Sequence, residues 1–200
     1  MAETESLSAE YEFLRHTEDA AELSKRCHTP LPDASDAAAF SRATALLEAV
    51  AGNMHTPLED RIFLAQTMPY PNILVKLSTD HEASVREAVA ANTDSKDWLV
   101  GRLTKDSDDT VRAKALMNPV TTWRMRMEGA QDSRTPASVL AHLGALGTEE
   151  DSKSPAVLAA MVRRAVAQNP NVDDETLRVL VADNVPDVAV AARETQQARG

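Results

Sequence analysis

Apolar residues recur along this chain in short runs that have the spacing of one helix face. In the segment VREAVAAN (85–92), apolar residues stand at i, i+3 and i+4 counted from Val85. This spacing is typical of a short amphipathic helix that buries one side. A close copy, VRRAVAQN, occupies 162–169, and a looser one, VRAKALMN, occupies 111–118. The pattern therefore predicts a recurring short helix.

Each copy ends on asparagine, which we expect to stop the helix. Asn92 is the example in the first copy, since asparagine tolerates the left-handed conformation found at helix ends. In the other two copies Pro119 and Pro170 follow the asparagine, and proline cannot continue a helix. A second run of helical spacing then covers 96–105 and 174–182. The predicted repeat is helix, tight turn, helix and loop.

The starts of the repeats keep an almost constant spacing. They fall at Val85, Val111, Ala137, Val162 and Val188, which are 26, 26, 25 and 26 residues apart. A fixed period of roughly 20 to 50 residues is the mark of a solenoid, in which one repeat cannot bury its own apolar face. The sequence predicts an all-α fold, namely a right-handed α-solenoid of stacked short helix pairs with a period of about 26 residues.

The Val-Arg pair that opens a helix after an Asp-containing loop resembles the leucine-rich repeat variant family. More loosely, it is similar to HEAT-type α-solenoids. The resemblance covers about residues 55–195 and rests on pairs such as Val85-Arg86 and Val111-Arg112. It implies a stack of helix pairs and says almost nothing about function.

The recurring arginines have two readings. Stacked arginines could follow the phosphates of a nucleic acid. The resemblance to HEAT-like repeats implies instead a structural ladder, in which the Asp of one loop pairs with the Arg of the next helix. Asp80 precedes Arg86 by six residues, and Asp106 precedes Arg112 by six. We favour the ladder, with each exposed pair contributing at most about 1 kcal/mol.

The repeats leave a different segment at each end. We expect an N-terminal acidic helical cap over 1–54, the repeat solenoid over 55–195, and a frayed tail over 196–200. Within the cap, 1–26 predicts one helix, or else a frayed acidic tail, and 35–51 predicts a second helix. Terminal repeats of solenoids are atypical, which suits the faint copy LLEAVAGN at the end of this second helix.

The repeat that starts at Ala137 is degenerate. Its stretch 144–153 is rich in polar and loop-forming residues, and we expect an exposed, mobile insertion there. The acidic run Glu149, Glu150 and Asp151 reads as solvated loop.

The charge is strongly acidic and uneven. The formal net charge is −10, with 12 acidic and 4 basic residues in 1–60, 10 and 11 in 61–147, and 9 and 6 in 148–200. A net negative charge opposes general binding to nucleic acid or to anionic lipid. The acidic excess is concentrated in the predicted cap.

Cellular location is predicted from cysteine usage and from hydropathy. Cys27 is the one cysteine, so no intramolecular disulfide can form. The N-terminus carries no apolar signal-like core, and no run approaches the roughly 18 apolar residues of a membrane span. We expect a cytoplasmic protein, and the richness in Ala, Arg, Asp and Val with little Lys suggests a bacterial source.

The candidate contact strip combines tryptophan with arginine on the second helices of adjacent repeats. Such clusters are found at protein hot spots and in clefts that hold single-stranded nucleic acid. Alternatively, the tryptophans fill grooves between helices. The near-neutral charge of the segment disfavours nucleic acid, which usually needs a basic stripe. The predicted binding residues are Trp98, Arg102, Trp123, Arg124 and Arg126.

Sequence signatures of catalysis are missing. There is no Gly-rich phosphate loop, no G-x-S-x-G and no i, i+4 pair of histidines. Some leucine-rich repeat variants carry an iron–sulfur cysteine cluster, which one cysteine cannot supply. We expect no metal, no cofactor and no enzyme activity. The prediction is a scaffold that binds a protein or peptide on its concave face. The alternative is a nucleic-acid-binding solenoid that resembles helical-repeat DNA glycosylases.

Overall fold

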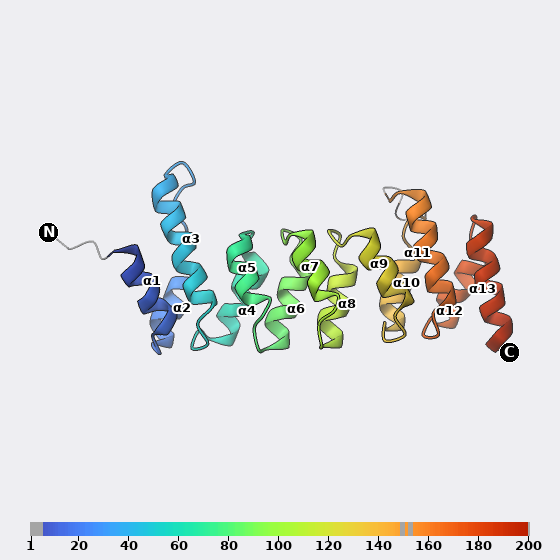
Figure 1. Ribbon diagram of the computed structural model, residues 1–200, viewed down its shortest axis with the longest axis horizontal. Coiled ribbons are helices and arrows are strands. Elements are labelled where there is room, and N and C mark those ends of the chain that lie inside the picture. Colours follow the sequence, from blue (N-terminus) through green and yellow to red (C-terminus); the bar gives the residue numbers. More distant parts are fainter. Residues whose placement is uncertain (1–5, 149–150, 152–153, 200) are drawn as a thin grey trace. The chain divides into compact units, whose positions relative to one another are not determined.

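The computed structural model describes residues 6–148, 151 and 154–199, and this part of the chain is all-α. It contains thirteen α-helices and no strand within those residues (Figure 1). None of these helices combines the length and the apolar character that crossing a bilayer would require. The chain forms two compact units, Met1–Leu99 (unit 1) and Val100–Gly200 (unit 2). This boundary lies within the segment that the sequence assigns to the repeats.

Unit 1 is built from two rows of helices, where each helix packs against the next one in its row. One row holds α1, α3 and α5, and the other holds α2, α4 and α6. The side chains between the rows are fully buried leucine, isoleucine and valine, each of which stabilises the fold by about 1.5–3 kcal/mol. The helices are α1 (Leu7–His16), α2 (Ala20–Cys27), α3 (Ala37–Ala51), α4 (Leu58–Thr67), α5 (Pro71–Leu77) and α6 (Ala83–Ala91).

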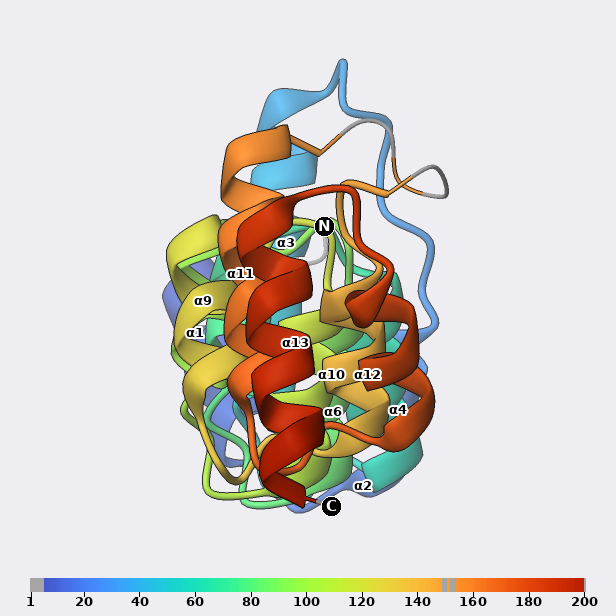
Figure 2. The same ribbon diagram turned by 90° about the vertical axis from the view of Figure 1, so that its right-hand side faces the viewer.

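Unit 2 has the same construction. The row of α8, α10 and α12 packs against the row of α9, α11 and α13, and Figure 2 shows α9, α11 and α13 side by side. Its core is a cluster of Leu, Val and Ala from both rows. The helices are α7 (Asp97–Leu103), which begins in unit 1, α8 (Asp109–Met117), α9 (Trp123–Gln131), α10 (Ala137–Gly144), α11 (Ala156–Gln168), α12 (Asp174–Val181) and α13 (Pro186–Arg199).

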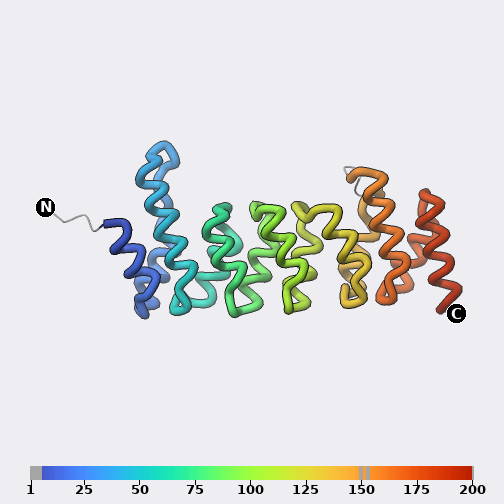
Figure 3. The backbone as a smooth tube through the Cα atoms, in the orientation of Figure 1, coloured from blue at the N-terminus to red at the C-terminus, as the bar shows by residue number. Residues whose placement is uncertain are grey.

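Copies of the repeated motif do not all lie in the same row of helices. The copies at Val111 and Val162 are both helical, yet α8 and α11 lie in opposite rows of unit 2. In the repeat that starts at Ala137, α10 is the one helix that the described residues form before α11 begins. Figure 3 traces the backbone path of this part of the chain. The described residues between α10 and α11 form turns, where Gly147 has a positive φ of 68° and Pro155 precedes α11. The described residues of this stretch agree with the expectation of a degenerate repeat that is loop-rich over 144–153.

Asparagine ends these helices by side-chain hydrogen bonds. Asn92 has an extended backbone (φ −68°, ψ 118°), and no residue other than glycine has a positive φ in the described chain. The predicted left-handed ending is therefore wrong. Instead, Nδ2 of Asn92 donates to the carbonyls of Ala65 (2.8 Å) and Met68 (3.0 Å), which end α4. Its Oδ1 accepts from the backbone N–H of Asp94 at 2.8 Å. The side chain thus stops its own helix and links it to the preceding helix of the row.

The two ends of the chain differ from the expected cap and tail. The N-terminal region contributes two helices, α1 and α2, where one was expected. Asp19 caps the start of α2, because its carboxylate accepts hydrogen bonds from the backbone N–H groups of Ala21 and Glu22. At the other end, α13 continues to Arg199. Arg199 donates to the carbonyls of Pro170 (2.9 Å) and Val172 (2.8 Å), and these bonds hold the last turn where fraying was expected.

Two glycines of unit 2 should respond oppositely to replacement by alanine. A Cβ on Gly129 would lie 2.8 Å from Cδ1 and 3.2 Å from Cγ of buried Leu116, so we expect Gly129→Ala to destabilise by about 1–3 kcal/mol. A Cβ on Gly101 would lie 3.3 Å from Cε and 3.7 Å from Cγ of the flexible Met125 side chain. We expect Gly101→Ala to stabilise by about 0.5–1 kcal/mol through helix propensity. Urea unfolding followed by circular dichroism checks both, and equal effects would contradict the packing described.

Candidate binding pocket

The five residues of the predicted Trp/Arg strip have different surroundings. Trp98 is 55 % exposed and belongs to unit 1, whereas the other four residues belong to unit 2. Arg102 is exposed on α7. On α9, Arg124 points to solvent and pairs with Glu128 at 3.0 Å. The remaining two residues, Trp123 and Arg126, are three positions apart, which is about one helical turn, so they share one face of α9. Arg124 lies on a different face.

Trp123 and Arg126 form a stacked pair at the wall of a pocket. Trp123 is partly buried against the core of unit 2, and the guanidinium carbon of Arg126 lies 4.7 Å from the centroid of its ring system. A cation over an aromatic face is stabilised by about 0.5–2 kcal/mol. The pair borders an open pocket of ≈ 530 Å³. Its lining residues are Met117, Pro119, Trp123, Arg126, His142, Ala145, Leu146, Asp151, Ser154 and Pro155.

Arg126 is a buried cation that contacts no counter-ion among the described residues. The residue is 7 % exposed, and its Nη2 donates to the carbonyls of Pro119 (3.1 Å) and Asn118 (3.5 Å). Its Nε is buried and has no hydrogen-bond partner among the described residues. Burial lowers the pKa of Arg126, and the charge of Asp151 works against that shift. Such a cation is costly unless something pairs with it.

Asp151 supplies the negative charge of the pocket. Its Oδ2 accepts from the backbone N–H of Gly147 at 3.1 Å and from the hydroxyl of Ser154. These hydrogen bonds, first that of Ser154 and then that of Gly147, lower the pKa of Asp151. The positive φ of Gly147 shapes the turn that presents this N–H. Asp151 is therefore ionised at neutral pH and partly held in place.

His142 completes the polar side of the pocket. The side chain is half-buried, and burial, followed by the charge of Arg126, lowers its pKa below the usual 6.5, while Asp151 acts in the opposite direction. The imidazole is therefore mainly neutral at pH 7. Among the described residues that line the pocket, Arg126 carries a positive charge and Asp151 a negative charge.

Two of the pocket's lining residues, Trp123 and Arg126, belong to the strip predicted from the sequence, whereas His142 and Asp151 do not. Asp151 was interpreted as part of a solvated acidic loop, and it is in fact half-buried and hydrogen-bonded. Glu149 and Glu150 of the same run, like part of the expected mobile insertion, lie outside the described residues. Gly147 and Ser154, which flank the acidic run in the sequence, are the residues that bond to Asp151.

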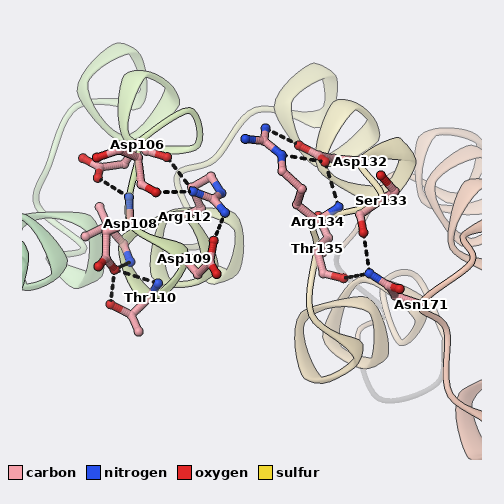
Figure 4. A network of polar contacts seen from close by, with 12 residues as sticks. Asp106, Asp108, Asp109, Thr110, Arg112, Asp132, Ser133, Arg134, Thr135 and Asn171 are labelled. Carbon is pink, nitrogen blue, oxygen red and sulfur yellow. Dashed lines mark hydrogen bonds and ion pairs between the residues drawn. The ribbon is translucent and has the colours of Figure 1, made fainter.

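The arginines of the predicted ladder contact the main chain of the loops. Nη1 of Arg86 donates to the carbonyls of Asp80 (2.8 Å) and His81 (3.2 Å). In Figure 4, Arg112 likewise donates to the carbonyl of Asp106 at 2.7 Å, and it also pairs with Asp109. The figure also shows the turn at Asp132, whose carboxylate accepts hydrogen bonds from the guanidinium of Arg134. These bonds are the main reason that the pKa of Asp132 is lowered to about 2.

Two Asp carboxylates of these loops form ion pairs with arginines about twenty residues earlier. Asp80 binds Nη1 of Arg61 at 3.0 Å, and both side chains are almost fully buried. Asp183 binds Arg163 through two bonds of 2.7 and 3.0 Å. Because these pairs are buried, the limit of about 1 kcal/mol for exposed pairs does not apply to them.

Other reactive side chains give no second site. Cys27 is buried, and desolvation followed by the charge of Asp60 raises its pKa to about 12, so the thiol is unreactive at neutral pH. His28 contacts Asp60 at 2.7 Å and stacks against Phe63 in unit 1. Within the described residues, no three His, Cys, Asp or Glu side chains are placed to hold a metal ion.

The fold and the pocket define an all-α protein of paired helix rows with an aromatic and basic pocket in its second unit. No known family model and no curated protein matches the chain. A crystal structure of an engineered protein is similar over 99 % of this chain and 94 % of its own, at 17 % identity and a TM-score of 0.25. A TM-score this low carries no argument about fold or function.

Proposed function

We propose that this protein is a non-catalytic helical-repeat scaffold that binds a protein or peptide partner. In this proposal the helix rows of the two units belong to one right-handed α-solenoid of the leucine-rich repeat variant or HEAT-like type. The concave face of that solenoid would carry the contact surface. The single cysteine and the composition support a bacterial, cytoplasmic location.

The observation that carries this proposal is the Trp123–Arg126 pair in an open pocket. Its volume of ≈ 530 Å³ lies in the range of about 300–1,000 Å³ that small ligands and anchor side chains occupy. Tryptophan and arginine are enriched at the residues that dominate binding energy between proteins. Met117, an exposed apolar side chain at 41 %, borders the same pocket. An aromatic anchor beside apolar walls suits a side chain of a peptide.

The charge supports a peptide over a nucleic acid. Unit 2 has 14 acidic and 13 basic residues, and Asp151 places a negative charge inside the pocket. A nucleic acid would need several uncompensated cations in a stripe. Arg124 is already paired with Glu128, and Lys105 pairs with the same carboxylate at 2.9 Å.

A peptide selection tests the proposal on the full chain. Random peptides are selected against the protein, and binding is measured by fluorescence in a Trp98→Phe background, where Trp123 is the remaining tryptophan. We expect Met117→Glu to weaken the selected peptides at least tenfold, which is about 1.4 kcal/mol, because it places a carboxylate in the apolar wall. Met54→Glu is the matched control, since Met54 is 69 % exposed in unit 1 and does not line the pocket.

Each outcome of the selection has a defined meaning. Peptides that bind with equal affinity to the Met117→Glu and the control variants would contradict the pocket as the contact site. No enriched peptide, together with steeply salt-dependent binding of single-stranded DNA, would replace the proposal by the nucleic-acid alternative.

A further inference from the structure

The pocket contains a charge that the described residues leave without an ionic contact. Arg126 is 7 % exposed, and its hydrogen bonds to the described residues go to two neutral carbonyls. Its Nε has no acceptor among the described residues. In the same unit, buried Arg163 is paired bidentately with Asp183. Arg126 therefore lines the pocket as a buried cation whose charge no described residue neutralises by direct contact.

The neighbouring charges select the kind of anion. Asp151 is ionised and lines the same pocket as Arg126. A dianion such as phosphate that bound to Arg126 would therefore be repelled by the nearby carboxylate of Asp151. A carboxylate carries a single charge, and its planar oxygens match the planar fork of a guanidinium. His142 is mainly neutral at pH 7 and adds no second cation. The local charge thus favours a monoanion.

The remaining walls select what the anion is attached to. Met117, Pro119, Leu146 and Pro155 are apolar and lie around the Trp123–Arg126 pair. The C-terminal residue of a polypeptide carries its carboxylate and its side chain on the same Cα, so both can enter one pocket. An internal Asp or Glu would use its side chain to reach Arg126 and leave the apolar walls uncovered.

We propose that this pocket binds the C-terminal residue of a partner polypeptide, with its carboxylate against Arg126 and an apolar side chain against Met117 and Trp123. The inference rests on the proposed function, because it names the part of the peptide that the scaffold recognises. The shared chemistry is a carboxylate next to an apolar group, and an internal acidic side chain is the other source of that chemistry.

Small probes test the carboxylate directly on the full chain. The probes are N-acetyl-leucine, the uncharged N-acetyl-leucinamide of the same shape, N-acetyl-glutamic acid α-amide and inorganic phosphate. Binding is followed by the NMR signals of the Trp123 indole N–H and the Arg126 Nε–H. We expect saturable shifts with N-acetyl-leucine at millimolar concentration, and affinities at least tenfold weaker for the other three probes.

Two variants separate a binding role from a structural one. Arg126→Met keeps the volume and removes the charge, and we expect it to abolish the difference between N-acetyl-leucine and its amide. Asp151→Asn removes the repulsive charge, keeps an oxygen for the Gly147 N–H, and should strengthen N-acetyl-leucine binding several-fold. If Arg126→Met does not fold, the Asp151→Asn result decides, because a purely structural Arg126 predicts no gain in affinity.

The outcomes distinguish the inference from the proposed function. Equal affinities for N-acetyl-leucine and N-acetyl-leucinamide, or no shift with either, overturn the carboxylate site. If N-acetyl-glutamic acid α-amide binds more tightly than N-acetyl-leucine, the pocket recognises an acidic side chain, and the assignment to a C-terminal residue is overturned. If selected peptides depend on Met117 but bind equally well as acids and as C-terminal amides, the scaffold function stands and this inference fails.

Discussion

Replacing Arg163 by alanine should lower the free energy of unfolding of unit 2 by about 3–5 kcal/mol, because a buried carboxylate loses its partner. Arg163 is 2 % exposed at its side chain and Asp183 5 %. Nε and Nη2 of Arg163 bind the two carboxylate oxygens at 2.7 and 3.0 Å, and Nη1 donates to the carbonyl of Leu146 at 2.8 Å. Alanine would leave Asp183 charged and unpaired in the interior.

The neighbouring Arg164 is the matched control. It is exposed on the same helix, so Arg164→Ala should change the stability by less than about 0.5 kcal/mol. Urea unfolding followed by the fluorescence of Trp123 in a Trp98→Phe background measures both variants in unit 2. The two arginines are adjacent in sequence and identical in type, so the difference between them isolates burial and pairing.

A double variant tests the cause of the loss. Arg163→Met with Asp183→Asn removes both charges and keeps an oxygen to accept from the N–H of Val185, which Asp183 now does at 2.8 Å. We expect this double variant to be more stable than Arg163→Met alone, since the unpaired carboxylate is gone. A double variant that is less stable than the single variant would show that the ion pair is not the source of the effect.

The sequence predicted the helices well because their apolar spacing is local information. The copies at 85–92, 111–118 and 162–169 are all helical, and they end at Asn92, Asn118 and Asn169. The row in which each helix lies could not be predicted this way. The row depends on how many helices separate two copies. In the described residues, the 25-residue step from Ala137 contains one helix, whereas the other steps contain two.

Two residues of the predicted contact strip line the pocket together, and their common helix face also follows from local spacing. Trp123 and Arg126 stand three apart, so a shared helix face follows from the sequence once α9 is recognised. Arg124 lies beside them in the chain but points to Glu128, and sequence proximity overstated its link to the site. His142 and Asp151 come from α10 and from the turn after it, so their approach to Arg126 depends on tertiary packing.

Asparagine performs the same function in both rows, which explains how one motif can occupy either. Nδ2 of Asn53 donates to the carbonyls of Leu14 (2.8 Å) and Thr17 (2.9 Å), which links α3 to α1. Asn92 makes the equivalent bonds to α4, and Asn169 makes them to α9. The motif therefore specifies a contact with the preceding helix of its own row, whichever row that is.

Asn169→Ala should consequently destabilise unit 2 by about 2–4 kcal/mol, because it leaves buried polar groups without partners. Nδ2 of Asn169 donates to the carbonyls of Ala130 (2.8 Å) and Asp132 (3.0 Å), and its Oδ1 accepts from the N–H of Asn171 at 2.9 Å. The residue is 2 % exposed, so water cannot replace these bonds without opening the turn. Urea unfolding of unit 2 measures the loss.

Asn184→Ala is the control, since Asn184 is exposed in the turn between α12 and α13. We expect it to change the free energy of unfolding by less than about 0.5 kcal/mol. Asn169→Asp adds a second test, because a carboxylate keeps the acceptor for Asn171 but brings a negative charge to the carbonyls of Ala130 and Asp132. We expect it to destabilise at least as much as alanine at neutral pH. If aspartate were tolerated there, the two donated bonds would not hold α11 to α9, and the link within the row would have to come from apolar packing alone.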